Sequence, residues 1–275
     1  MAAKRAQHLW GAMLTAVSRR DPFRNQWTVV DGRPWQVGLS GPTRSAGVPG
    51  IVLVHGLGCS HRYFSPLASA LSDLSLAAPD LPGFGGTVGP PQALDVRGLS
   101  IALARWLHAS GNVGAMIVAN SVGCQVVVDL AAHSPRLIGP AVLVGPTMDA
   151  QARNVAAQAW RLATNLGREH PSLLPVLAAD YLRCGPLRYM RTMHHALHDR
   201  IEDKIASLAP GSVVVRGERD PIASREWGEA LADRMGAELV ELPDAGHTLN
   251  WSAPDELAEV VRAVATQQVD SLANC

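Results

Sequence analysis

The feature of this sequence that most constrains its fold is an alternation of short, β-branched apolar runs with amphipathic segments of helix length. This alternation is typical of a mostly parallel sheet covered by helices on both faces. Asp31 and Gly32 separate the first two runs, where a tight hairpin turn is expected, so the sheet should open with an antiparallel pair and continue parallel. We therefore predict an α/β fold with an eight-stranded sheet. The predicted strands are residues 27–30, 35–39, 51–54, 76–78, 115–118, 141–144, 213–215 and 238–242.

The alternation is interrupted between the sixth and seventh predicted strands. Residues 148–208 contain no strand candidate and only helix-like sequence, after which the strand–helix pattern resumes. A helical bundle that packs only on itself is one interpretation of this segment. Its position inside the pattern favours a helical lid inserted after strand 6, over a site on the sheet. The predicted division is an α/β core in 1–147 and 209–275, with a lid in 148–208.

The composition restricts the partners. The chain has 275 residues, of which 47% are hydrophobic, and its 24 basic and 24 acidic side chains give a formal net charge of zero. The chain has no excess of basic residues that would indicate a nucleic-acid partner, so a small-molecule substrate is expected. The sequence does not indicate an oligomeric state. The cysteines show no CxxC spacing, and they are interpreted as free thiols in a reducing compartment, with no metal and no cofactor expected. They are Cys59, Cys124, Cys184 and Cys275.

The first twenty residues contain a mostly apolar stretch at 9–17, followed by Arg19 and Arg20. This stretch is too short to cross a bilayer, and no integral membrane segment is predicted. No clear signal-peptide cleavage site follows it. An amphipathic helix that packs on the domain, or lies at a membrane surface, is expected instead. We predict a cytoplasmic protein.

One serine stands in a context that suits a nucleophile. The segment 114–123 reads GAMIVANSVG, so an apolar strand leads into Ser121 and a helix follows it. A sharp strand-to-helix turn projects the serine hydroxyl from the end of the sheet, and the helix N-terminus favours developing negative charge. A serine hydroxyl also needs a nearby base, which histidine provides near neutral pH, and a buried carboxylate that orients the histidine.

Three segments together resemble the α/β-hydrolase superfamily, and the resemblance covers about residues 27–265. Ser121 lies in a nucleophile elbow, although Ala119 stands where the usual G-x-S-x-G pattern has glycine. The strand 213–215 runs into a G-x-x-D pattern that ends at Asp220, and the last strand is followed by a Gly-His pair that ends at His247. The resemblance implies that Ser121 is the nucleophile, Asp220 the acid and His247 the base. Asp149 and Asp244 are rival candidates for the acid.

The same resemblance extends to two loops. The strand 51–54 runs into an HG-x motif, which implies that the backbone N–H groups of Leu57 and Val122 form the oxyanion hole. The run DLPGFG at 80–85 is similar to the D-x-P-G-x-G loop of the superfamily. By this resemblance His55 and Asp80 are structural residues.

Several activities are compatible with this resemblance. We expect a carboxylic ester hydrolase that cleaves an ester, lactone or thioester bond of a small, hydrophobic substrate through an acyl-enzyme. Asn120 and Trp251 are faintly similar to features of carbon–carbon bond hydrolases of meta-cleavage products, but Thr248 stands where that family has tryptophan. A perhydrolase, a non-hydrolytic cyclase or a small-molecule receptor that uses the same pocket is a further alternative.

Overall fold

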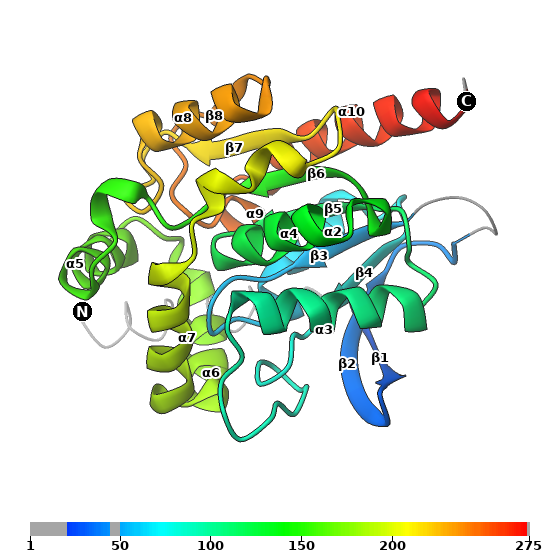
Figure 1. Ribbon diagram of the computed structural model, residues 1–275, viewed down its shortest axis with the longest axis horizontal. Coiled ribbons are helices and arrows are strands. Elements are labelled where there is room, and N and C mark those ends of the chain that lie inside the picture. Colours follow the sequence, from blue (N-terminus) through cyan, green and yellow to red (C-terminus); the bar gives the residue numbers. More distant parts are fainter. Residues whose placement is uncertain (1–20, 45–49, 274–275) are drawn as a thin grey trace, which may run out of the picture.

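The computed structural model describes residues 21–44 and 50–273. It contains one eight-stranded sheet in the order β1-β2-β4-β3-β5-β6-β7-β8 (Figure 1). This confirms the predicted fold class, and each strand contains or overlaps a predicted run. The strands are β1 (Arg24–Val30), β2 (Arg33–Ser40), β3 (Ile51–Val54), β4 (Leu76–Pro79), β5 (Ala115–Asn120), β6 (Ile138–Val144), β7 (Val213–Gly217) and β8 (Leu239–Leu242). The helix expected near residues 9–17 lies outside the described residues.

The hairpin at the start of the sheet is confirmed. Asp31 and Gly32 both have positive φ, at 50° and 73°, which matches the twist of the flanking strands and closes β1 onto β2. The prediction of a single antiparallel pair was wrong, because β2 is also antiparallel to β4. The other neighbours pair in parallel. The apolar pattern identifies strands, but it does not identify which strand each one pairs with.

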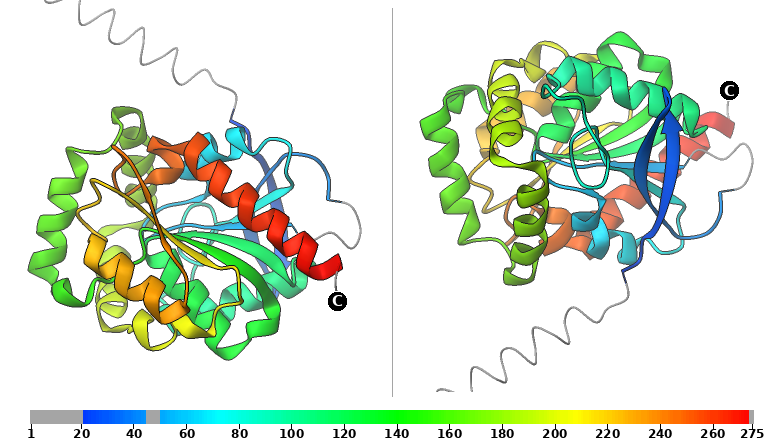
Figure 2. Two further views of the ribbon diagram at one scale, coloured as in Figure 1. Left: turned by 90° about the horizontal axis from the view of Figure 1, so that it is seen from above. Right: turned by 90° about the horizontal axis from the view of Figure 1, so that it is seen from below.

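Helices cover both faces of the sheet (Figures 1 and 2). The sheet divides the buried apolar side chains into two clusters. In β3, Val52 and Val54 join the cluster under α3, α4 and α8, whereas Ile51 and Leu53 join the cluster under α2, α9 and α10. Because both faces are covered, β3 is apolar at every position. These helices are α2 (Ser65–Ala70), α3 (Val96–Ala109), α4 (Val122–His133), α8 (Arg225–Met235), α9 (Leu249–Ser252) and α10 (Pro254–Ala273).

The segment between β6 and β7 is helical, and we call residues 148–208 the helical insertion. Its helices lie beside the sheet at one end of the strands (Figure 1). They are α5 (Val155–Leu166), α6 (Leu174–Cys184) and α7 (Pro186–His198), with the 3-10 turns η3 (Ala150–Ala152), η4 (Pro171–Leu173), η5 (Ile201–Asp203) and η6 (Ile205–Ser207). Two further turns, η1 (His61–Phe64) and η2 (Pro135–Leu137), lie outside the insertion. Among the described residues, no helix is long and apolar enough to cross a membrane.

Charged side chains fasten the insertion to the core. Asp180 of α6 is fully buried and accepts a hydrogen bond from the Ser60 hydroxyl at 2.7 Å, and it pairs with Arg62. At the other end, Arg161 of α5 donates to the carbonyl oxygen of Ile222 at 2.8 Å. The insertion is therefore held against the loop that follows β3 and the loop that follows β7.

Candidate active site

Ser121 occupies a strained turn between β5 and α4. Its φ of 58° and ψ of −124° are unusual for a residue with a side chain, and such strain is found mainly at functional sites. The turn also needs a small neighbour, because a Cβ on Gly123 would lie 2.6 Å from the Val54 carbonyl oxygen and 2.7 Å from that of His55. Ala119, the departure from the usual pattern, is fully buried in the core.

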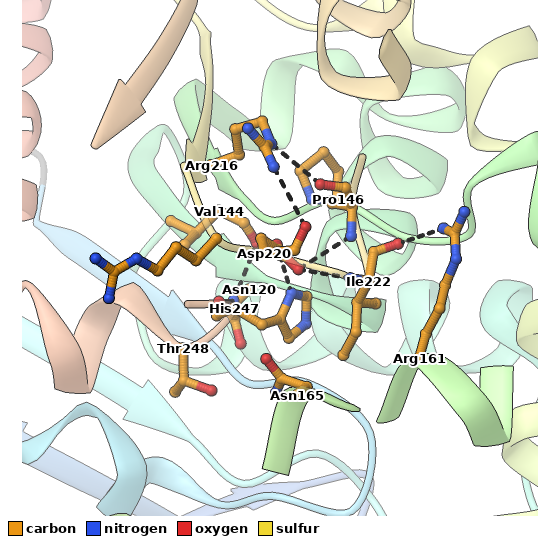
Figure 3. Close-up of polar contacts among 12 residues, drawn as sticks. Asn120, Val144, Pro146, Arg161, Asn165, Arg216, Asp220, Ile222, His247 and Thr248 are labelled. Carbon is orange, nitrogen blue, oxygen red and sulfur yellow. Dashed lines mark hydrogen bonds and ion pairs between the residues drawn. The ribbon is translucent and has the colours of Figure 1, made fainter. Parts of the chain in front are cut away.

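Asp220 and His247 are brought together from the ends of two neighbouring strands, β7 and β8. Nδ1 of His247 lies 2.8 Å from Oδ2 of Asp220 (Figure 3). The other carboxylate oxygen accepts the N–H groups of Ile222 at 2.7 Å and Ala223 at 3.1 Å. Within the described part of the chain, Nε2 of His247 is buried and has no hydrogen-bond partner. With the proton on Nδ1, this nitrogen is free to accept a proton.

The environment of His247 changes its basicity. Burial alone would lower the pKa of His247, but the charge and hydrogen bond of Asp220, with a smaller contribution from Glu169, raise it above its ordinary value. Behind the pair, the buried Arg216 donates to the Asp220 carbonyl oxygen at 3.2 Å, which fixes the turn that presents the carboxylate (Figure 3). Nothing in the sequence pattern indicated this role for Arg216.

The two rival acids have other partners. Asp149 accepts hydrogen bonds from Arg161 and from the Ser224 hydroxyl at 2.8 Å, and it caps the turn at Gln151. Asp244 is exposed and pairs with Arg219 on the surface. Of the three aspartates considered, Asp220 is the one that contacts His247.

Ser121 and His247 line one apolar cavity of approximately 620 Å³, together with Leu57 and Val122. This volume suits a small organic ligand. Val122 is the first residue of α4, so its N–H has no partner within the helix and is available to a bound anion. The helical insertion supplies the opposite wall of the cavity, with Gln158, Ala159, Leu162, Ala163, Asn165, Leu166, Glu169, Leu174, Leu177, Ala178, Tyr181, Tyr189 and Met193.

His55 and Asp80 have contacts of a structural kind. His55 accepts the N–H of Leu81 at 3.0 Å, and burial lowers its pKa. Asp80 accepts the N–H of Gly86 at 2.8 Å and contacts the backbone and ring of His61. These bonds tie the 80–86 loop to the segment that follows β3.

A buried polar network, which no local motif indicated, joins the loops of the site. The Tyr63 hydroxyl accepts the N–H of Gly56 at 2.7 Å and donates to Oδ1 of Asn120 at 3.0 Å. Nδ2 of Asn120 in turn donates to the carbonyl oxygens of Val144, at 3.0 Å, and His247, at 3.4 Å. Asn120, which precedes the nucleophile candidate, therefore has a structural role, because it links the end of β5 to these loops.

The helical insertion also places one carboxylate at this site. Oε1 of Glu169 accepts both the N–H of Thr248 at 3.0 Å and its hydroxyl at 2.8 Å. Thr248 follows His247 directly, so a side chain of the insertion holds the loop of the predicted base. No local pattern indicated a role for Glu169, because Thr248 is 79 positions away along the chain.

Comparison with known proteins agrees with this architecture. Residues 51–260 match the Alpha/beta hydrolase family. The chain belongs to this family.

Lipase LipV of Mycobacterium tuberculosis (strain ATCC 25618 / H37Rv) is 31% identical over 121 residues, which are 44% of this chain and 43% of LipV. The biotin biosynthesis bifunctional protein BioHC of Cellvibrio japonicus (strain Ueda107) is 31% identical over 247 residues, 78% of this chain and 47% of BioHC. The chain thus spans less than half the length of these curated relatives.

Solved structures share the fold of this α/β hydrolase. The enol-lactonase from Burkholderia xenovorans LB400 superposes with a TM-score of 0.72 at 21% identity, covering 88% of this chain and 100% of the lactonase chain. At this level of identity the similarity concerns the fold, and the activity has to be argued from the site.

Proposed function

We propose that this α/β hydrolase is a serine hydrolase that cleaves an ester, lactone or thioester bond of a small, hydrophobic substrate. The observation that carries the proposal is the 2.8 Å contact between His247 and Asp220 beside the strained turn of Ser121, with the serine and the histidine lining one apolar cavity. A nucleophile, a base and a residue that orients the base are the minimum for acyl transfer by serine.

In the first step, Nε2 of His247 takes the hydroxyl proton of Ser121 while the serine oxygen attacks the carbonyl carbon of the substrate. Asp220 holds the imidazole and stabilises its positive charge. The negative charge on the former carbonyl oxygen is stabilised by the N–H groups of Leu57 and Val122. The bond to the leaving group then breaks, the histidine gives its proton to that group, and an acyl-enzyme remains on Ser121.

In the second step, water replaces the leaving group. His247 takes one proton from the water molecule, the resulting oxygen attacks the acyl carbon, and the carboxylic acid leaves as the proton returns to the Ser121 oxygen. No cofactor or metal enters this sequence, since the serine, the histidine and water account for every bond that forms or breaks.

The lining of the cavity supports a hydrophobic substrate. Leu162, Leu177 and Met193 of the insertion face the site together with Leu57 and Val122 of the core. Burial of apolar substrate area against such a wall contributes about 25 cal/mol for each Å². We propose that the helical insertion acts as a lid, which would exclude water from the acyl-enzyme until the leaving group has gone.

Turnover of aryl esters of increasing acyl length, measured beside the Ser121→Ala protein, tests this proposal. We expect turnover by the unaltered protein and none above background by the variant, with an optimum acyl length that reflects the cavity volume. Undiminished turnover by Ser121→Ala would overturn the proposal.

Carbon–carbon bond hydrolysis is the second candidate, suggested by Asn120 and Trp251. The contacts weaken this suggestion, because Asn120 is engaged with Tyr63 and the indole N–H of Trp251 donates to the Ser172 hydroxyl. Reaction of Ser121 with a fluorophosphonate, combined with no turnover of any ester by the folded protein, would favour this candidate.

A further inference from the structure

Glu169 is fixed in place beside the predicted base. It is 6% exposed, lies between α5 and η4, and lines the cavity. Three donors converge on its Oε1 atom: the backbone N–H and hydroxyl of Thr248, and Nδ2 of Asn165 at 2.9 Å. A carboxylate held by three hydrogen bonds cannot turn away, so the position of its second oxygen is also determined.

The second oxygen of Glu169 and the amide oxygen of Asn165 are unpaired. Among the described residues, neither Oε2 of Glu169 nor Oδ1 of Asn165 has a hydrogen-bond partner, although both atoms are buried. Native proteins rarely leave buried acceptors unpaired, and the exceptions are often functional. Nε2 of His247 is the third unpaired atom of this corner of the cavity, and it is an atom that the substrate must reach. Figure 3 shows the Asn165 side chain beside the His247 ring.

The charges around the cavity are asymmetric. Its lining, which lies wholly in the described part of the chain, includes no lysine or arginine, and Glu169 is its one carboxylate. An anionic group brought to this corner would meet a like charge with no cation to compensate it. A neutral or cationic group that donates a hydrogen bond would satisfy the unpaired oxygens.

We propose that Oε2 of Glu169 and Oδ1 of Asn165 bind a hydrogen-bond donor on the leaving group of the substrate, such as a hydroxyl, an amide N–H or an ammonium group. This inference rests on the proposed function. The leaving-group side follows from the position of Thr248 next to His247, since the histidine delivers its proton to the leaving group. The protein therefore selects esters whose alcohol carries a second donor close to the scissile bond.

Two esters of equal size test this inference directly. Propyl butanoate and 2-hydroxyethyl butanoate differ by the replacement of a methyl group with a hydroxyl. After correction for their rates of alkaline hydrolysis, we expect kcat/KM of the hydroxy ester to be about tenfold or more higher, because a site built for a donor discriminates strongly against its absence. Propyl 3-hydroxypropanoate carries the hydroxyl on the acyl side, and it should show no such gain over propyl butanoate.

The variant Glu169→Gln retains the shape of the side chain and an oxygen for Thr248, but it presents an amide N–H₂ group where Oε2 was. We expect the ratio of kcat/KM between the two butanoates to fall to about one, whereas Asn165→Ala should lower it partially. Glu218→Gln is the matched control, since Glu218 is exposed, lies outside the cavity lining and should leave the ratio unchanged. A ratio is used because any loss of fold or of base strength affects both esters equally.

The possible failures are distinct from one another. Equal turnover of the two butanoates by the unaltered protein, or a gain confined to the acyl-side hydroxyl, would overturn the inference and leave the proposed function intact. An unchanged ratio in both Glu169→Gln and Asn165→Ala would also overturn it. Turnover of none of the esters would overturn the proposed function, and the inference with it.

Discussion

The Tyr63 hydroxyl lies 3.0 Å from Oδ1 of Asn120, the residue that precedes the predicted nucleophile. The same hydroxyl accepts the N–H of Gly56, the residue before Leu57. One phenolic oxygen thus connects the end of β5 with the loop that carries a predicted oxyanion donor. Tyr63 is 1% exposed, so this hydrogen-bonded group is held within the core.

Tyr63→Phe should therefore reduce both stability and activity. The substitution leaves the N–H of Gly56 and Oδ1 of Asn120 buried without their partner, which costs about 1–3 kcal/mol for an unsatisfied polar group. We expect the free energy of unfolding in urea to fall by about this amount and kcat to fall about tenfold, through displacement of the Leu57 N–H. Tyr189→Phe is a suitable control for the stability measurement, since the structure describes no hydrogen bond of the Tyr189 hydroxyl. Equal stability of the two variants would show that the network contributes nothing.

The assignment of Asp220 as the acid that orients His247 is tested by substituting each of the three candidate aspartates. Asp220→Asn should lower kcat by a factor of about 10³–10⁴, because the amide favours the wrong imidazole tautomer and does not stabilise the imidazolium. Asp244→Asn should change kcat little, since that side chain is exposed and pairs with Arg219. Asp149→Asn should lower stability more than kcat, because it weakens the pair with Arg161. Steady-state kinetics with an aryl ester measures all three, and an active Asp220→Asn protein would refute the assignment.

Local patterns account for the parts of this structure that could be predicted from the sequence. Runs such as 51–54 and 115–118 are apolar at every position because both faces of their strands are covered, and the Asp31-Gly32 pair indicates its own turn. Ser121, Asp220 and His247 could be proposed because each follows a strand in a short local motif. The structure places the last two in contact.

Contacts between distant segments account for the parts that could not be predicted. Glu169 and Thr248, or Ser60 and Asp180, have no local pattern that joins them, and their partners are determined by how the helical insertion lies on the sheet. The antiparallel pairing of β2 with β4 was missed for a similar reason. A strand sequence records which faces are buried, whereas the identity of its neighbour depends on the packing of the whole sheet.

The pH dependence of kcat/KM should reflect the environment of His247. The base must be neutral to accept a proton, so activity falls as the pH drops through the pKa of His247. Burial lowers that pKa, but Asp220 and, to a smaller extent, Glu169 raise it above its ordinary value of 6.5. The midpoint of the acid limb should therefore lie above pH 6.5.

Glu169→Gln removes one of the charges that raise the pKa of His247, so its acid limb should move to lower pH. The profile is measured with one aryl ester from pH 5 to 9, with Glu218→Gln as the control. A purely structural role for Glu169 would lower the rate at every pH and leave the midpoint where it is. A midpoint that does not move would therefore contradict an electrostatic influence of Glu169 on the base.

Gly145→Ala should disturb the pair of Asp220 and His247 without changing either residue. A Cβ at position 145 would lie 2.8 Å from Nδ1 of His247 and 3.0 Å from Oδ2 of Asp220, so the imidazole must shift. Even a small displacement of a catalytic group can cost about 10²-fold in rate, and we expect such a loss in kcat/KM. Gly145 also has a φ of 53°, where alanine is strained by about 1–2 kcal/mol.

Gly236→Ala separates the two effects of this substitution. Gly236 has a similar φ of 65°, but a Cβ there would meet no atom within 4 Å. It should therefore lose a similar amount of stability from backbone strain and retain full activity. Thermal unfolding and kcat/KM, measured together on both variants, provide the comparison. Equal activity of the two would mean that the cavity accommodates a moved imidazole, and that the contact between Asp220 and His247 is less important for turnover than its position implies.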